Sequence, residues 1–431
     1  MFDKLQRKLV NVFIFLDLTK MEKKVPYNQK KVVPMQNRRV QKLVKKAYKI
    51  PFYKERFDRA GVKPEDIKTG DDLAKLPLLT KDELRGWMKE EEKKPKYRYW
   101  FKDTTSGSSG VPLMVLFSPR EKAYMMANWF RVMLVAGYNP FRGKTMSRRS
   151  AHSVTGGHDT VLQRIGILRR GFLNQYAPEA DMVRQINDYK PEFLYMNKTE
   201  FMRLCLYCKQ NNVKLHKPRF YTPTGEKIDD TARALFREIL GPGIIDSYGT
   251  AEAGACMVKL FDAKEYTIHQ DSFVVNIMDD EGHVATEGKI VVTPLYKTDI
   301  PLINYVVGDK GNAEVKDGVK VISNVQGRMN DFFRYKTGEV TTFFEIAPII
   351  AHCTDVLQIR FIQESYDLIR VQCVLNAQDS TRTKEEAQKE LETALQAKFK
   401  HPFTLEFEWM QVIPPDPNGK LRMIVCNVAG R

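Results

Sequence analysis

The alternation of hydrophobic and polar positions predicts helices and strands along most of the chain. Residues 120–135 and 231–240 carry apolar residues at helical spacing, and Gly241-Pro242-Gly243 ends the second of these helices. Short apolar runs bounded by turn residues predict strands at 193–195, 244–246, 273–278 and 289–293. Because such strands alternate with helical stretches between residues 169 and 294, we expect an α/β architecture with sheets covered by helices.

Local signals add detail to the first third of the chain. Thr80 followed by Glu83 has the spacing of a capping box and predicts a helix that begins after Thr80. Residues 97–101 and 113–117 are expected to form strands on either side of a loop rich in Ser and Gly. The sequence Pro64-Glu65-Asp66 predicts a short turn.

The pattern changes after Gly327 and predicts a compact α+β module. Its expected elements are strands at 358–363, 368–375 and 405–411, and a charged helix at 384–399. We therefore place a domain boundary within residues 327–331. This divides the chain into a large α/β domain at 1–326, with a basic helical lobe at 1–100, and a small mobile α+β domain at 327–431.

The charge is concentrated near the N-terminus. The chain of 431 residues has a formal net charge of +16, and its first 50 residues hold 14 Lys and Arg against 3 Asp and Glu. A basic lobe favours anionic partners such as nucleotides, anionic lipid or an acidic carrier protein, although a solvated positive face is the simpler interpretation. We find no motif of a nucleic-acid-binding module and expect no nucleic-acid partner.

Two further segments bear on the location of the protein and on metals. Residues 9–18 are apolar but too short to span a bilayer, so they either touch a membrane as an amphipathic helix or pack on the protein itself; we favour packing. Six scattered cysteines indicate a reducing cytoplasm. Cys205 and Cys208 have CxxC spacing near His216, but without a second ligand pair we interpret them as core residues rather than zinc ligands.

The loop at 104–112 is the first candidate site. Thr104, Thr105, Ser106, Gly107, Ser108, Ser109 and Gly110 supply hydroxyls, backbone N–H groups and the glycine flexibility that a polyphosphate needs. The spacing is not that of a Walker loop. A Ser/Gly stretch can also be a plain linker, so motifs elsewhere in the chain must decide between the two.

Those motifs follow in order along the chain. They are Thr224-Gly225-Glu226, Asp246-Ser247-Tyr248-Gly249-Thr250-Ala251-Glu252, Asn304-Tyr305-Val306-Val307-Gly308-Asp309, Gly327-Arg328-Met329-Asn330-Asp331 and a glycine-bearing turn at 414–422. Tyr248 offers an aromatic face to a purine, Thr250 a hydroxyl to a phosphate and Glu252 a carboxylate to Mg²⁺. Asp309 can accept hydrogen bonds from ribose hydroxyls, and Lys420 is a flexible cation for a phosphate.

Together these segments resemble the superfamily of adenylate-forming enzymes, which includes acyl-CoA synthetases and the adenylation domains of peptide synthetases. The opening segments at 50–57 and 76–81, with Gly156-Gly157 and Lys190-Pro191, are similar to its phenylacetate–CoA ligase branch, which includes relatives from capsular-polysaccharide synthesis. The resemblance implies a two-step reaction. A carboxylate attacks the α-phosphate of ATP, and the acyl group then passes to a thiol or an amine.

The resemblance also implies roles for individual residues. The catalytic group comprises Lys420, Thr250 and Glu252, with Glu252 also holding Mg²⁺ and Asn330 acting as the hinge. Acyl-pocket residues would be Gly156, Gly157, Ala253 and Gly254. Nucleotide contacts would come from Thr104 to Gly110 and from Gly225, Glu226, Asp246, Ser247, Tyr248, Gly249, Asp309 and Arg328.

The chain departs from the family's pattern at three positions, and these leave the acceptor open. Val306-Val307 stands where Arg-Thr is usual, Asn330 replaces the usual Asp or Lys of the hinge, and Ala251 replaces a hydroxyl residue. We expect CoA as the acceptor of a small carboxylic acid. An amine or a carrier protein, or a scaffold that binds nucleotide without catalysis, are the alternatives. A homodimer is the default for such an enzyme.

Overall fold

The computed structural model divides into two compact units, which are described separately. Unit 1 comprises residues 1–139 and 245–326, and unit 2 comprises residues 140–244 and 327–431. The structure describes residues 10, 13–14, 16–104, 113–149, 166–167, 169–174, 177–326, 332–342, 345–346, 349–350, 353, 355–376, 382–414, 416 and 421–428. Among these, no helix is long and apolar enough to cross a membrane.

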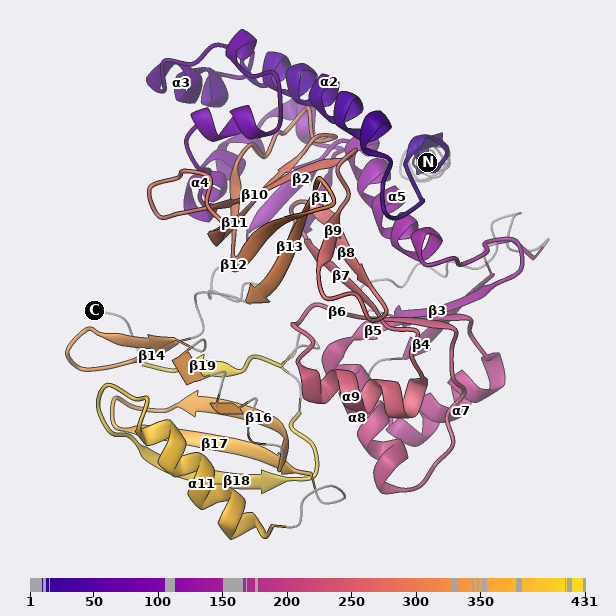
Figure 1. Cartoon of the computed structure of the whole chain (residues 1–431), viewed down its shortest axis with the longest axis vertical. Helices are drawn as coiled ribbons and strands as arrows, with labels where there is room; N and C mark the ends of the chain where they lie inside the picture. The colour runs from indigo at the N-terminus through magenta and orange to yellow at the C-terminus, as the bar shows by residue number, and fades with distance from the viewer. Residues whose placement is uncertain are drawn as a thin grey trace. The chain divides into compact units, whose positions relative to one another are not determined.

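Unit 1 is built on an antiparallel sheet of seven strands from residues 245–326 (Figure 1). The strand order is β10-β11-β12-β13-β9-β8-β7. β10 (Phe273–Met278) is buried along its whole length and pairs with β11 in register from Phe273 opposite Pro294. The other strands are β7 (Ile245–Thr250), β8 (Gly254–Leu260), β9 (Tyr266–Ile268), β11 (Glu287–Pro294), β12 (Tyr305–Lys316) and β13 (Val319–Gln326).

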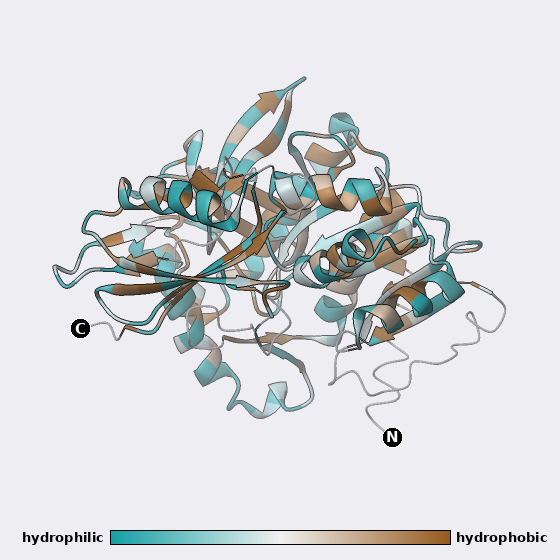
Figure 2. Ribbon diagram, turned by 90° about the horizontal axis from the view of Figure 1, so that it is seen from below, coloured by the Kyte–Doolittle hydropathy of each residue, from teal (hydrophilic) through white to brown (hydrophobic). Residues whose placement is uncertain are grey.

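The remaining elements of unit 1 come from residues before 139. They include a two-stranded sheet of β1 (Phe101–Thr104) and β2 (Met114–Phe117), and the helices α2 (Gln29–Ala47), α3 (Pro51–Arg59), α4 (Lys81–Glu91) and α5 (Pro119–Val135). Short 3₁₀ turns occur at Pro64–Asp66, Asp71–Lys75 and Pro95–Tyr97. In Figure 2 hydrophobic and hydrophilic residues alternate along the helices, a pattern typical of helices that cover a core with one face.

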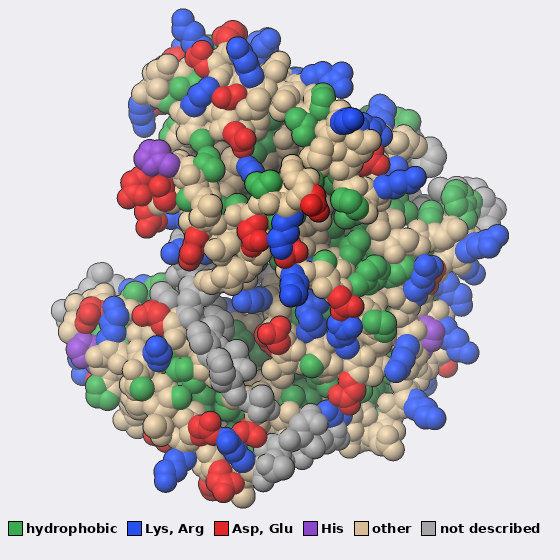
Figure 3. All heavy atoms as spheres, viewed as in Figure 1, with side chains coloured by type: hydrophobic (Ala, Val, Ile, Leu, Met, Phe, Trp, Pro, Cys, Tyr) green, Lys and Arg blue, Asp and Glu red, His purple; other side chains and the backbone are tan. Residues whose placement is uncertain are grey.

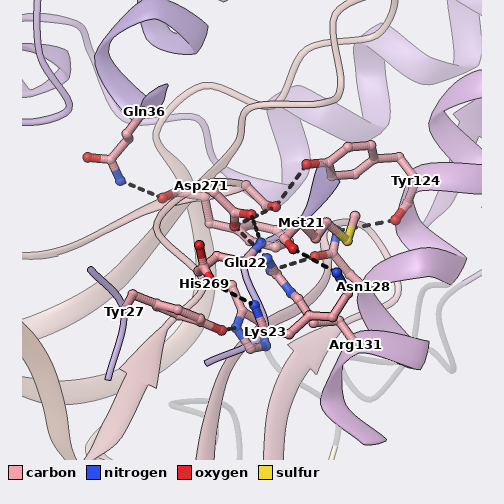
Figure 4. Close-up of polar contacts among 12 residues, drawn as sticks. Met21, Glu22, Lys23, Tyr27, Gln36, Tyr124, Asn128, Arg131, His269 and Asp271 are labelled. Carbon is pink, nitrogen blue, oxygen red and sulfur yellow. Dashed lines mark hydrogen bonds and ion pairs between the residues drawn. The ribbon is translucent and has the colours of Figure 1, made fainter. Parts of the chain in front are cut away.

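A buried polar network joins the N-terminal segment of unit 1 to its sheet (Figure 4). The Arg131 guanidinium donates to Asp271 Oδ1 at 2.5 Å, and both side chains are almost fully buried. The backbone N–H of Glu22 donates to the other oxygen of Asp271 at 3.2 Å. Tyr27 and His269 share a buried hydrogen bond of 2.6 Å, and burial holds the pKa of His269 well below its usual value. The strap at 21–27 is therefore held by polar contacts as well as by packing.

Unit 2 contains a parallel sheet with strand order β4-β3-β5-β6, formed by residues 144–224. The strands are β3 (Lys144–Arg149), β4 (Arg169–Asn174), β5 (Phe193–Asn197) and β6 (Phe220–Thr224), and the helices are α7 (Glu179–Tyr189), α8 (Lys198–Gln210) and α9 (Asp230–Leu240). Cys205 and Cys208 lie buried in the core between these helices and the sheet. Their interpretation as core residues is confirmed.

The C-terminal part of unit 2 forms a second sheet, of order β18-β17-β16-β19, and a hairpin. Its elements are β14 (Phe332–Arg334), β15 (Val340–Thr342), β16 (Val356–Gln363), β17 (Leu368–Leu375), α11 (Lys384–Gln396), β18 (Thr404–Met410) and β19 (Ile424–Cys426). Leu391 and Leu395 of α11 are buried in one core with Phe361 and Val371. The α+β pattern expected for this part of the chain is confirmed.

Most predicted elements are confirmed, and two expectations are corrected. The Thr80 capping box is present, with the Glu83 N–H donating to Thr80 Oγ1 at 3.2 Å. Residues 97–101 are not a strand, because Pro95 begins a 3₁₀ turn and β1 starts only at Phe101. Helices do not alternate with strands beyond residue 240. Residues 241–326 contain no helix and form the antiparallel sheet.

Candidate active site

The β7–β8 hairpin carries the central motif of the predicted site. β7 ends at Thr250 and β8 begins at Gly254, so the loop between them consists of residues 251–253. Thr250 Oγ1 accepts a hydrogen bond from the N–H of Ala253 at 3.1 Å, which leaves its hydroxyl proton available as a donor. A Cβ on Gly249 would lie 2.5 Å from the carbonyl oxygen of Gly254, so only glycine allows the strands to approach this closely.

A bulge in β12 sets the position of Asp309. Val306 pairs with Val291 of β11 and Lys310 pairs with Lys289, so the residues 307–309 oppose the single residue Ile290. Gly308 at the centre of the bulge has a φ of +94°, a conformation that glycine adopts without steric cost. Bulges redirect side chains next to sites, and this one does so for the carboxylate expected to bind ribose.

The first of two tyrosine–carboxylate pairs joins Tyr248 to Asp309. The Tyr248 hydroxyl donates to Asp309 Oδ2 at 2.5 Å. Burial, and secondarily the charge of Asp309, raises the pKa of Tyr248 well above its usual value. The phenol therefore remains a hydrogen-bond donor throughout the physiological pH range. The ring of Tyr248 also meets Tyr266 edge-on, with centroids 6.3 Å apart.

The second pair joins Tyr305 to Glu252. The Tyr305 hydroxyl donates to Glu252 Oε1 at 3.0 Å, and Tyr305 and Glu252 are 1% and 6% exposed. Glu252 Oε2 accepts no hydrogen bond from the described residues. The sequence prediction missed Tyr305. Tyr305 could have been noticed because it stands at the start of the strand that carries Asp309. The sequence could not show, however, that its hydroxyl reaches a carboxylate 53 positions away.

Both pairs cross the sheet between strands that are not neighbours. β12 and β7 are separated in the strand order by β13, β9 and β8. Tyr248 on β7 nevertheless contacts Asp309 on β12, and Tyr305 on β12 contacts Glu252 beside β7. The sheet must therefore curve strongly, and its curvature brings Tyr248 to Asp309 and Tyr305 to Glu252.

The other predicted residues of the hairpin surround these pairs. Asp246 forms an ion pair with Lys259 at 3.4 Å, and the buried Ser247 hydroxyl has no hydrogen-bond partner among the described residues. The carbonyl oxygen of Ala253 accepts a hydrogen bond from the Tyr296 hydroxyl at 2.8 Å. A Cβ on Gly254, whose φ is +78°, would come 2.8 Å from Met125. The predicted acyl-pocket residues Ala253, at the end of the loop, and Gly254, at the start of β8, are both buried.

Glu252 suits a magnesium ion that shares its coordination with a substrate. Across the described part of the chain, no three His, Cys, Asp or Glu side chains converge into a metal site. Magnesium in phosphate-transferring sites is commonly held by one or two carboxylates together with phosphate oxygens and water. With Oε1 fixed by Tyr305, Oε2 is the oxygen that could serve as such a ligand.

Gly225 and Glu226 belong to unit 2 and follow β6. Gly225 is exposed with a φ of +84°, and Glu226 accepts hydrogen bonds from the Thr199 hydroxyl at 2.7 and 2.9 Å. Thr104 is the last residue of β1. The other predicted site residues lie outside the described residues: Thr105, Ser106, Gly107, Ser108, Ser109, Gly110, Gly156, Gly157, Arg328, Asn330 and Lys420. Their roles stay predictions.

Comparisons with known proteins give a family match for the C-terminal part of the chain and several relatives. Residues 333–427 match the CapK C-terminal domain family. Protein CapK of Staphylococcus aureus is 22% identical over 391 residues, which cover 88% of this chain and 85% of the relative. Phenylacetate-coenzyme A ligase of Pseudomonas putida is 24% identical over 62% of this chain and 63% of the relative.

Solved structures show the same fold. A 2-hydroxyisobutyryl-CoA ligase in the postadenylation state, in complex with 2-HIB-AMP, superposes with a TM-score of 0.72 at 18% identity, over 91% of this chain and 89% of the other. The amide bond synthetase McbA from Marinactinospora thermotolerans gives a TM-score of 0.51 at 16% identity, over 74% and 67% of the two chains. The chain is thus similar in sequence to phenylacetate–CoA ligases and protein CapK and shares its fold with a CoA ligase, in agreement with the resemblance to adenylate-forming enzymes that its sequence shows.

Proposed function

We propose that the protein activates a small carboxylic acid with ATP, releases pyrophosphate and passes the acyl group from the acyl-adenylate to CoA. The observation that carries this proposal is the pair of fixed carboxylates on the curved sheet of unit 1. Asp309 and Glu252 are each held by a tyrosine hydroxyl, at 2.5 and 3.0 Å, before any ligand arrives. Preorganised polar groups cost no rearrangement when the substrate binds.

Asp309 and Tyr248 would bind the nucleoside part of ATP. Asp309 lies at the bulge of β12, and its carboxylate would accept hydrogen bonds from ribose hydroxyls. Tyr248 orients that carboxylate through its hydroxyl and has an aromatic ring on which a purine can stack. The hydroxyl proton of Thr250, which its contact with Ala253 does not use, would be donated to a phosphate oxygen.

Glu252 and Lys420 would manage the charge that develops at the phosphates. A magnesium ion bound to Glu252 would neutralise phosphate charge and stabilise the pyrophosphate leaving group. Lys420, whose role rests on the family resemblance, would donate to oxygens of the α-phosphate and the attacking carboxylate. Removing one such donor from an acyl-transfer site costs about 10²–10³ in rate.

The acceptor is proposed as CoA because the relatives in this branch are named as CoA ligases and a fold neighbour is a CoA ligase. A fold neighbour that is an amide bond synthetase keeps an amine acceptor as the alternative, together with a carrier protein. The buried residues Ala253 and Gly254 would border the acyl group, so we expect a small acid.

The test is pyrophosphate release from MgATP with a panel of aryl, fatty and amino acids. Wild-type protein should show release that depends on one class of acid. Lys420→Ala and Asp309→Asn should lose it, Asp309→Asn through a raised KM for ATP. Asp317→Asn is the matched control, because Asp317 is an exposed carboxylate on the β12–β13 turn of the same sheet.

Adding CoA, then amines, then a phosphopantetheinylated carrier to the active acid would identify the acceptor. If the protein binds ATP but no acid supports release, the proposal fails and a nucleotide-binding scaffold takes its place. If Asp317→Asn falls as far as Asp309→Asn, the assignment of Asp309 to the nucleotide is wrong.

A further inference from the structure

The parallel sheet of unit 2 gathers cationic side chains at its amino edge. All four strands run in the same direction, so the residues that precede them meet at one edge. Backbone hydrogen bonds tie these entries together: Glu192 N–H donates to the Lys144 carbonyl at 2.8 Å, and Phe220 N–H to the Glu192 carbonyl at 2.9 Å. Figure 3 shows Lys and Arg side chains gathered on the side of this unit where β3 and β4 lie.

At this edge lies a hollow of about 360 Å³. Six cationic side chains line it, and Glu192 is the only carboxylate residue among its lining residues. The six are Arg142, Lys144, Arg169, Lys190, Lys217 and Arg219. The volume falls within the range of small-molecule pockets, which is roughly 300–1,000 Å³.

Three of the six cations are used by the fold itself. Lys144 Nζ donates to the carbonyl of Tyr189 at the end of α7, at 3.0 Å. Arg169 donates to the carbonyl of Arg142, and Arg219 pairs with Glu192 at 3.3 Å. These contacts hold the loops that form the hollow. The one carboxylate of the lining, Glu192, is already paired with Arg219.

The side chains of the other three, Arg142, Lys190 and Lys217, are exposed and make no hydrogen bond or ion pair with the described residues. They converge on a concave surface where like charges repel one another. A concave wall of one sign concentrates the electrostatic field and attracts counter-ions more strongly than a convex one. Arg142 adds a planar guanidinium that can bind two phosphate oxygens at once, while the lysines act as mobile point charges.

We propose that this hollow binds a small molecule that carries two or more phosphate groups. One phosphate would meet Arg142, and a neighbouring one would lie between Lys190 and Lys217. A single small anion would neutralise only part of the cationic lining, and an extended polyanion would not fit a hollow of this volume. The proposal does not depend on the proposed function.

This binding site is separate from the predicted nucleotide residues of unit 2. Gly225 and Glu226 follow the carboxyl end of β6, whereas Arg219 and Lys217 precede its amino end. The five residues of β6 separate the two ends by roughly 16 Å, at about 3.3 Å per residue. One phosphate chain therefore cannot occupy both places.

The test uses inorganic tripolyphosphate with the full chain in 0.15 M NaCl. Lysines are labelled with acetic anhydride, and mass spectrometry reads each amine separately, so binding at the nucleotide site does not confuse the result. Labelling of Lys190 and Lys217 should fall several-fold with tripolyphosphate. Lys42 and Lys45 of α2 should not change, since they are exposed cations on a convex helix and make no hydrogen bond or ion pair with the described residues.

Two matched variants make the test quantitative. Lys190→Asn/Lys217→Gln should weaken tripolyphosphate binding at the hollow by about tenfold or more, whereas Lys42→Gln/Lys45→Gln should change it by less than about twofold. Asn is chosen at position 190 because that residue has a φ of +50°, which Asn tolerates. CTP in place of tripolyphosphate shows whether a nucleoside adds to recognition of the phosphates.

The proposal is overturned if Lys190 and Lys217 are not protected at this salt concentration, or if Lys42 and Lys45 are protected equally. It is also overturned if sulfate protects as well as tripolyphosphate, because then one anionic group suffices. Protection without any ATP-dependent pyrophosphate release would leave this inference standing and reject the proposed function.

Discussion

Two sets of cationic side chains, one in each unit, have opposite roles. In unit 1, Arg131 and Lys297 are fully buried and each is held by partners from distant segments. In unit 2, Arg142, Lys190 and Lys217 stand exposed around a hollow. The same residue types therefore act as buried structural contacts in the first set and form a charged surface in the second.

The difference lies in what neutralises the charge. Arg131 has Asp271, and Lys297 donates to the carbonyl of Leu116 at 3.0 Å with its ammonium 3.7 Å from the centroid of the Phe117 ring. Burying such a cation costs desolvation free energy that its partners offset. Removing a partner must therefore lower the stability of the fold. The exposed cations of the hollow contribute nothing comparable, so their removal should affect binding alone.

The largest effect is expected from Arg131→Met. It leaves Asp271 as an uncompensated buried carboxylate, and breaking a buried pair this way costs about 3–5 kcal/mol. Urea unfolding of the full chain, followed by Trp fluorescence, measures the loss. Arg131→Met/Asp271→Asn should be more stable than the single variant, because the stranded charge is gone. Equal stability of the single variant and the wild type would refute the role given to this pair.

The second prediction concerns Lys297 and pH. Burial lowers the pKa of Lys297 to about 8 from its usual value near 10.5, against the opposing charge of Glu121. Below pH 8 the amine is protonated in both states, and its buried charge opposes folding. From pH 8 to 10.5 the folded protein releases the proton while the unfolded chain keeps it, so this group makes stability rise with pH.

Lys297→Met isolates that contribution. The pKa difference corresponds to a free-energy change on the order of 3 kcal/mol, spread over this window. The difference in unfolding free energy between wild type and variant should therefore shift in favour of the wild type as pH rises from 7.5 to 10. A difference that stays constant across these pH values would show that the amine remains protonated in the fold.

The third prediction tests whether the buried Tyr305 hydroxyl fixes the position of the Glu252 carboxylate. Tyr305→Phe removes the donor to Glu252 while keeping the ring packed. A buried acceptor that loses its hydrogen bond costs about 1–3 kcal/mol, and we expect about a tenfold fall in pyrophosphate release with a higher Mg²⁺ requirement. Tyr248→Phe is the companion variant and should raise the KM for ATP instead. A purely structural Tyr305 would lower stability without altering the Mg²⁺ dependence.

The smallest effect on stability is expected at the hollow. Lys190→Asn/Lys217→Gln should change the unfolding free energy by less than about 0.5 kcal/mol, since exposed substitutions away from pairs rarely do more. Thermal unfolding at low and high salt measures it. Any change should be a slight gain that fades as salt screens the repulsion. A loss comparable to that of Arg131→Met would mean that these lysines support the fold.

Sequence reasoning predicted the elements whose causes are local. The Thr80 capping box and β10 at Phe273–Met278 were correct because cap spacing and apolar runs act within a few residues. The antiparallel sheet after residue 240 was not foreseen, since strand pairing such as β13 with β9 depends on residues more than fifty positions apart. Pro95 shows the reverse case, where a local signal for a turn outweighed a strand-like run.

The site was predicted as a set of residues, but its connections were not. Tyr248, Glu252 and Asp309 were each chosen for their own chemistry, and the structure brings Tyr248 to Asp309 and Tyr305 to Glu252. Nothing in the sequence indicates that Tyr305 faces Glu252, because that contact requires the sheet to curve. The pairing of Arg131 with Asp271 is equally long-range, and in the sequence Arg131 looks like a polar position on an amphipathic helix.

The curvature of the seven-stranded sheet links the folding of unit 1 to the geometry of its candidate site, because the same curve positions both carboxylates. Two hydrogen bonds of opposite direction brace the curve, one donated by Tyr248 and one by Tyr305. Its shortest strand, β9, spans three residues and pairs with β13 at only two positions, Thr267 with Val321 and Tyr266 with Ile322. That seam is where the curve would open if a brace were lost. The distance between the Asp309 carboxylate, proposed for ribose, and the Glu252 carboxylate, proposed for the metal, is therefore set by the curvature of the sheet as much as by the two residues themselves.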